Sequence, residues 1–184
     1  MEEAMTDATL HRITLRELLA GATILESRGD LDVNVGSVIH DSRRVRPGDV
    51  FFAIDGAKVR GLTFAKKARD AGAAAIVGSA LPEDDSGVAV AISDVRRVMG
   101  RAASAASGHP SRVVPTVGIT GTNGKTTITF LLEAAWTAAG KRSGVVGTID
   151  ARVSGETSIH TGFTTPEAPD LQKLLADMVD AGAA

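Results

Sequence analysis

The chain has 184 residues, of which 43% are hydrophobic and 23% charged, with a formal net charge of −2. This length allows two small globular domains, and the charge balance excludes a basic nucleic-acid-binding domain. There is no cysteine, the start of the chain is acidic, and no apolar stretch approaches the roughly 20 residues of a membrane span. We therefore expect a cytoplasmic protein without nucleic-acid or membrane partners.

The first part of the chain alternates predicted helices and strands. Thr14 and Glu17 have the spacing of a capping box, which opens a short helix that Gly21 stops. The apolar pattern then predicts an alternating segment at 33–40, a strand at 50–54, a helix at 63–71, strands at 73–77 and 88–92, and a helix from Asp94 to about Ala106. Strands that alternate with helices favour parallel α/β packing.

A polar stretch at 107–111 is typical of a linker, and the most informative segment follows it. Residues 113–119 form an apolar, β-branched run that predicts a strand, and 127–139 predict a helix. Between them, residues 118–127 read Gly-Ile-Thr-Gly-Thr-Asn-Gly-Lys-Thr-Thr and fit the pattern G-x-x-x-x-G-K-[ST] of a phosphate-binding loop. The sequence therefore predicts a site for a nucleoside triphosphate.

The residues of this loop suit polyphosphate binding. Glycines let the backbone turn its N–H groups towards the phosphates, and the following helix adds the positive end of its dipole. Lys125 is expected to neutralise charge on the β- and γ-phosphates and to be the catalytic residue, while the Thr126 hydroxyl is expected to hold Mg²⁺. The predicted ATP site comprises Gly121, Thr122, Asn123, Gly124, Lys125, Thr126 and Thr127.

Beyond the loop, the pattern predicts a strand at 145–149, a hairpin of 151–153 with 157–161, and a helix at 169–181. We place the domain boundary between residues 111 and 112, so that 1–111 form a small α/β domain and 112–184 begin a second one. A phosphate-loop sheet normally has more strands than the second part offers. We therefore expect the second domain to be incomplete.

Several of these segments together resemble the Mur ligase family. They are the loop at 118–127, Asp41-Ser42-Arg43, the run from Pro47 to Ala53 with Gly56, and Thr164-Thr165-Pro166-Glu167-Ala168 followed by Leu171-Gln172. The last segment is similar to the MurE branch. The resemblance covers nearly the whole chain from about Ile13.

The resemblance implies an ATP-dependent amide ligase of peptidoglycan precursor synthesis. In that family, ATP phosphorylates the carboxylate of UDP-MurNAc-L-Ala-D-Glu, and the amine of diaminopimelate or lysine attacks the acyl phosphate. Ser42, Thr164 and Thr165 correspond to positions that bind the UDP-linked substrate. For Ser42 the alternative is a hydroxyl bonded within its own turn, and for the two threonines it is capping of the last helix.

The sequence departs from the family pattern in two ways. Arg60 stands where an acidic residue commonly precedes the second glycine of a loop, and Phe163 where an asparagine often precedes the two threonines. The later metal-binding glutamate, the carbamylated lysine and the C-terminal domain that binds the incoming amino acid are not in this chain. We therefore expect these 184 residues alone to form no amide bond.

Three other kinds of protein share some of these features. A non-catalytic module that binds a UDP-sugar or ATP fits the same residues. Another Mur-type or folylpolyglutamate-synthase-type ligase shares the phosphate loop, although the Thr164–Ala168 segment argues against it. A GTPase switch is disfavoured, because the chain lacks an Asn-Lys-x-Asp motif.

Overall fold

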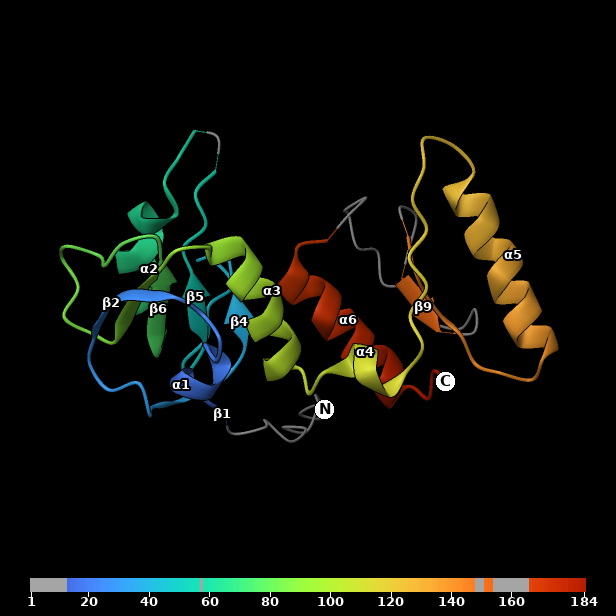
Figure 1. Cartoon of the computed structure of the whole chain (residues 1–184), viewed down its shortest axis with the longest axis horizontal. Helices are drawn as coiled ribbons and strands as arrows, with labels where there is room; N and C mark the ends of the chain where they lie inside the picture. The colour runs from blue at the N-terminus through green and yellow to red at the C-terminus, as the bar shows by residue number, and fades with distance from the viewer. Residues whose placement is uncertain (1–12, 57, 148–150, 154–165) are drawn as a thin grey trace, which may run out of the picture. The chain divides into compact units, whose positions relative to one another are not determined.

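The computed structural model describes residues 13–56, 58–147, 151–153 and 166–184. Contacts within the chain divide it into two units, Met1–Ala106 and Ser107–Ala184 (Figure 1). Both contain helices and strands, so the mixed α/β class expected from the sequence is confirmed. The domain boundary placed after residue 111 stays a prediction.

A five-stranded sheet with the order β2-β7-β6-β5-β4 forms the centre of the first unit. Its strands are β2 (Ile24–Arg28), β4 (Val38–Ile39), β5 (Val50–Phe52), β6 (Ala75–Gly78) and β7 (Ala89–Ile92). Strands β4 to β7 pair in parallel and β2 pairs antiparallel with β7, and β4, β5 and β6 lie side by side in Figure 1. A second ladder pairs β1 (Ile13–Thr14) antiparallel with β3 (Asn34–Val35).

The core of the first unit lies on the central parallel strands. Every residue of β5, β6 and β7 is buried, as expected of strands covered on both faces. On one face, Phe51, Ile76 and Ala89 pack in one cluster with Ala65 and Ala68 of helix α2 (Ala65–Asp70), which continues the 3-10 turn η1 (Gly61–Phe64). This packing fixes the connection between β5 and β6 against the sheet.

Local capping defines the two remaining helices of this unit, α1 (Leu15–Leu18) and α3 (Val95–Ala106). The Thr14 N–H donates to Glu17 Oε2 at 2.9 Å, and the Glu17 N–H donates to Thr14 Oγ1 at 3.2 Å. The predicted capping box is therefore confirmed. At the start of α3, the Arg97 N–H donates to Asp94 Oδ1 at 3.2 Å, which confirms Asp94 as the N-cap.

The second unit contains three helices and a two-stranded ladder among its described residues. These elements are α4 (Pro110–Val113), α5 (Lys125–Ala138), β8 (Gly144–Val146), β9 (Ala151–Val153) and α6 (Ala168–Asp180). Strands β8 and β9 pair antiparallel, so the parallel packing expected for this part is not found in its described strands. A small apolar cluster joins Ala151 and Val153 to Met178 of α6.

The strand predicted at 113–119 is not present. Val113 ends helix α4, and residues 114–120 form no ladder with any described strand. Val113 and Val117 are 63% and 60% exposed, which shows that the apolar run is not covered. A β-strand depends on hydrogen bonds from a neighbouring strand, so an apolar β-branched segment without such a neighbour stays irregular.

Further elements differ from the sequence-based expectation. Strand β9 pairs with β8, whereas its predicted hairpin partner at 157–161 lies outside the described residues. Strand β2 and helix α4 have no counterpart in the prediction. Strand β2 lies at the edge of the sheet and is largely exposed, so its sequence carries little of the apolar pattern that identifies a buried strand.

Candidate functional site

The glycine-rich loop leads directly into helix α5. Gly121 and Gly124 have φ angles of 145° and 78°, a backbone region that residues with a Cβ rarely adopt. Gly124 is the N-cap of α5, and because it has no side chain it leaves the first-turn N–H groups without a side-chain acceptor. Residues 121–124 are exposed. The loop therefore presents backbone donors to solvent, as phosphate binding requires.

Lys125 begins helix α5 and reaches back over the loop. Its Nζ donates a hydrogen bond to the Gly121 carbonyl at 2.6 Å. Thr126 and Thr127 follow in the first turn and are exposed, so the Thr126 hydroxyl is accessible from solvent. The structure thus brings the lysine, the hydroxyl and the glycine-containing backbone of the predicted ATP site together at one helix end.

Ser42 lies three residues beyond the end of β4, at the carboxyl edge of the parallel strands. The residue is only 7% exposed, and its hydroxyl makes no hydrogen bond within the described part of the chain. The turn after β4 is closed instead by Asp41, whose Oδ1 accepts the Arg43 N–H at 3.0 Å. The alternative in which the Ser42 hydroxyl closes its own turn is therefore not found.

Asp41 is ionised and already paired at this edge. Arg43 contacts the carboxylate with Nη2 at 2.7 Å from Oδ2 and with Nε at 2.9 Å from Oδ1. These hydrogen bonds from Arg43 lower the pKa of Asp41 to about 2, against the opposing effect of burial. The positive charge of Arg43 is balanced by Asp41, so the pair adds little net charge to this edge. An anion bound there would have to be neutralised by other positively charged groups.

The remaining predicted substrate residues are not placed by the structure. Thr164 and Thr165 lie outside the described residues, as does Phe163, which precedes them, so a binding role for the two threonines stays a prediction. The N-cap of helix α6 is Glu167. Capping of that helix by either threonine, the alternative to a binding role, likewise stays a prediction, because both threonines lie outside the described residues.

A partly buried ion pair ties the helix of the phosphate loop to the β8–β9 ladder, and the sequence analysis missed it. Arg152 of β9 donates to Glu133 of α5 from Nε at 3.1 Å and from Nη2 at 2.6 Å, and the two side chains are 10% and 12% exposed. The Arg152 guanidinium also lies 4.5 Å from the centre of the Phe130 ring. No local pattern identifies such a pair, because its partners are 19 residues apart.

The described part of the chain holds neither a cluster of metal ligands nor a membrane-spanning helix. No group of three or more His, Asp or Glu side chains in that part of the chain is arranged to hold a metal ion. Within the same ranges, no helix has both the length and the apolar character needed to cross a membrane. At the phosphate loop itself, the exposed hydroxyl of Thr126 is a side-chain oxygen of the kind that Mg²⁺ accepts as a ligand.

Two family profiles match the chain. The profile described as "Mur ligase family, catalytic domain" matches residues 34–113, and the profile described as "Mur ligase middle domain" matches residues 119–184. The second match contains the phosphate loop from Ile119 onwards. The first contains Ser42 and the parallel strands of the sheet.

Curated relatives and a solved structure agree with these matches. The chain is 44% identical over 161 residues to a UDP-N-acetylmuramoyl-L-alanyl-D-glutamate--2,6-diaminopimelate ligase of Geobacter metallireducens, covering 86% of this chain and 31% of the relative. It is 38% identical over 162 residues to a UDP-N-acetylmuramyl-tripeptide synthetase of Deinococcus radiodurans, covering 86% and 33%. A solved structure of a UDP-N-acetylmuramoyl-L-alanyl-D-glutamate--2,6-diaminopimelate ligase superposes with a TM-score of 0.72 at 25% identity, covering 94% of this chain and 34% of that one. The chain spans about a third of the length of these relatives.

Proposed function

Because this chain belongs to the Mur ligase family and matches the N-terminal portion of MurE-type ligases, we propose that it carries the substrate-binding and ATP-binding parts of such a ligase. The complete enzyme would add diaminopimelate or lysine to UDP-MurNAc-L-Ala-D-Glu through an acyl phosphate. The observation that supports this most strongly is the phosphate loop with Lys125 at its helix end, in a chain 44% identical to a ligase of that name. We also propose a cytoplasmic location, because ATP is the phosphoryl donor of this reaction.

In the proposed phosphoryl transfer, the residues of the loop have distinct roles. Lys125 would exchange its bond to the Gly121 carbonyl for the β- and γ-phosphates of ATP, holding the transferred group in place. The exposed Thr126 hydroxyl suits Mg²⁺, which would supply positive charge against the phosphate oxygens. Positioning and charge neutralisation are the main requirements of phosphoryl transfer.

The first unit would hold the nucleotide end of the muramoyl substrate. The support is the place of Ser42 at the carboxyl edge of a parallel sheet, where ligands of open α/β sheets bind, and its hydroxyl, which has no partner in the part of the chain that the structure describes. The incoming amino acid would need a further domain, as the family resemblance implies. A non-catalytic module that binds UDP-sugar or ATP remains the second candidate, because the same residues would serve binding without turnover.

Isothermal titration of the chain with Mg-ADP and with UDP-MurNAc-L-Ala-D-Glu tests the proposal. We expect Lys125→Met to weaken ADP binding by about tenfold or more, since it removes a charge-assisted hydrogen bond, and to leave the muramoyl substrate unaffected. Ser42→Ala should weaken binding of the muramoyl substrate and leave ADP binding unaffected. If folded wild-type protein binds neither ligand, the proposal is wrong. If the complete enzyme with Lys125→Met still forms the amide at the wild-type rate, the ligase assignment of the loop fails and the binding module is favoured.

A further inference from the structure

Helix α5, which begins at the phosphate loop, contacts the rest of its unit along one narrow stripe. Its large apolar residues Ile128, Phe130 and Leu131 are 47%, 46% and 65% exposed, so they contribute little packing. The half-buried positions recur at helical spacing and are Lys125, Thr129, Leu132, Glu133 and Trp136. A carboxylate, and not an apolar side chain, therefore lies within the contact stripe of this helix.

The β8–β9 ladder presents one face to α6 and the other to α5 (Figure 1). Ala151 and Val153 pack with Met178 of α6, and a Cβ on Gly144 would stand only 2.6 Å from Met178 Sδ. Successive side chains of a strand point to opposite faces. Arg152 lies between Ala151 and Val153 and therefore points away from α6, to the face where its guanidinium meets α5.

Arg152 holds α5 at two points. Its Nε and Nη2 donate to the two carboxylate oxygens of Glu133 at 3.1 and 2.6 Å, and its guanidinium carbon lies 4.5 Å from the centre of the Phe130 ring. A bidentate pair with a planar guanidinium fixes direction as well as distance. Phe130 precedes Glu133 by three residues and is its neighbour on the helix surface. The two contacts together define the rotation of α5 about its axis and its position along the ladder.

Stability alone does not account well for this pair. The side chains of Arg152 and Glu133 are only 10% and 12% exposed, so both charges have lost most of their water. The desolvation of such a pair largely offsets its attraction, and apolar residues of similar volume often stabilise a fold as well or better. Apolar contact, however, has no preferred direction. What the ion pair adds is a defined orientation of the helix.

The orientation of α5 determines where the phosphate loop points. Glu133 comes eight residues after Lys125, which corresponds to about 12 Å along a helix. A rotation or a shift of the helix at Glu133 is therefore passed on to Lys125 and to the N–H groups of the loop. These groups must meet the same phosphate oxygens, and a misplacement of about 1 Å can weaken such a site by about 100-fold.

We propose that Arg152 is a positioning residue for the phosphate loop. Through Glu133 and Phe130 it sets the orientation of α5, and thereby aims the N–H groups of the loop and Lys125 at the phosphates of the nucleotide. This inference rests on the proposed function, since it concerns the same ATP site. Arg152 acts through the helix and not on the nucleotide itself.

The test is isothermal titration of the whole 184-residue chain with Mg-ADP, beside urea unfolding followed by the fluorescence of Trp136, the single tryptophan, which lies on α5. Arg152→Met removes the fork and keeps an unbranched apolar side chain. We expect it to weaken Mg-ADP binding by about tenfold or more in folded protein. Because the pair is largely out of water, the loss should be similar at low and high salt. Arg152→Lys keeps the charge but not the fork, so its affinity should lie between those of Arg152→Met and the wild type.

Two control variants separate positioning from stability and from charge. Met178→Ala loosens the packing on the other face of the ladder and should lower the urea midpoint, but folded protein should bind Mg-ADP as the wild type does. Lys173→Met makes the same charge change as Arg152→Met, at an exposed pair with Asp177 on α6, and should alter neither quantity. A purely stabilising role of Arg152 would instead make affinity follow the urea midpoint in every variant.

The outcomes also separate this inference from the proposed function. If Lys125→Met weakens Mg-ADP binding but Arg152→Met binds like the wild type, the positioning role is refuted and the ATP site stands. If Met178→Ala loses as much affinity as Arg152→Met, general loosening of the unit explains the loss and the positioning role is again refuted. If Arg152→Met does not fold, Arg152→Lys decides, since wild-type affinity there refutes the role and weaker binding supports it. If the folded wild-type chain binds no Mg-ADP, both proposals are overturned.

Discussion

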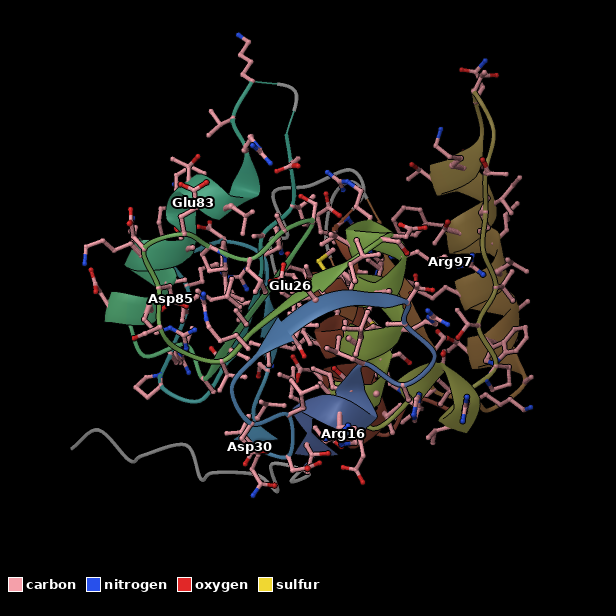
Figure 2. The ribbon with its side chains drawn as sticks, turned by 60° about the vertical axis from the view of Figure 1, so that its left-hand side comes forward. Arg16, Glu26, Asp30, Glu83, Asp85 and Arg97 are labelled. Carbon is pink, nitrogen blue, oxygen red and sulfur yellow. The ribbon has the colours of Figure 1, made fainter. Side chains whose placement is uncertain are left out.

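Arg69 of helix α2 is the residue whose loss should damage the first unit most severely. Its Nε donates to Asp85 Oδ1 at 2.9 Å and its Nη2 to Asp85 Oδ2 at 2.8 Å. The same guanidinium donates to the carbonyls of Ala73 at 2.6 Å and Val88 at 2.9 Å. Figure 2 shows Asp85 beside helix α2, so one side chain joins this helix, the start of β6 and the loop before β7.

Replacing Arg69 by methionine keeps much of the apolar stem but leaves Asp85 without its main partner. The Asp85 side chain is 8% exposed and that of Arg69 is 23% exposed, so the pair is largely removed from water. Removing one partner of a buried pair costs about 3–5 kcal/mol. Arg28 remains 3.9 Å from the same carboxylate. We therefore expect a loss at the lower end of this range, about 3 kcal/mol of the free energy of unfolding.

The measurement is urea denaturation of the whole chain, followed by circular dichroism and by hydrogen exchange of peptides from β6 and β7. The single tryptophan, Trp136, lies in the second unit, so its fluorescence reports that unit and should change little. Arg16→Met is the control, because the Arg16–Asp32 pair is 62% exposed on both sides and should matter far less. A loss below about 1 kcal/mol in Arg69→Met, or an equal loss in the control, would refute this reasoning.

Two further predictions concern the same unit. Hydrogen bonds from Arg69 lower the pKa of Asp85, so its contribution to stability is present above the pKa of an unfolded aspartate, about 4, and is lost as the pH falls through the lower folded value. Urea midpoints measured from pH 6 to pH 2.5 should therefore decline more steeply below pH 4 in the wild type than in Arg69→Met, and parallel curves would contradict this. Gly61→Ala should destabilise the chain by about 3 kcal/mol, the upper end of overpacking costs, because its Cβ would meet backbone at 2.4 Å. Gly56→Ala, whose Cβ meets only ordinary contacts, should be tolerated, and equal melting temperatures for the two variants would contradict the packing argument.

Features that depend on neighbours in the sequence were predictable. The Thr14–Glu17 capping box, the Asp94 N-cap and the start of helix α5 at the phosphate loop all follow from interactions within one helical turn. The buried strands β5, β6 and β7 were predictable as well, because a strand covered on both faces is apolar along its whole length. The family resemblance rested on the same short segments.

Features that depend on distant partners were decided only by the tertiary structure. The apolar run at 113–119 has the composition of a strand but no described neighbour to pair with, and β9 pairs with β8 instead of the segment that follows it. The pairs Arg69–Asp85 and Glu133–Arg152 join residues 16 and 19 positions apart. Hydrogen bonds between strands and ion pairs between elements that are distant in the chain need both partners in place, and a linear pattern describes only one partner at a time.

The two candidate sites illustrate the same division. By itself the sequence determined the phosphate loop, because glycine conformation, the lysine and the helix N-terminus all act within ten residues. Only the folded sheet decided that Asp41 closes the turn after β4 while the Ser42 hydroxyl has no partner among the described residues, and that Asp55 accepts the Gly61 N–H after the neighbouring strand. Parallel strands bring residues far apart in the chain to one edge, and the partners that remain unpaired there are set by packing, which is a property of the whole sheet.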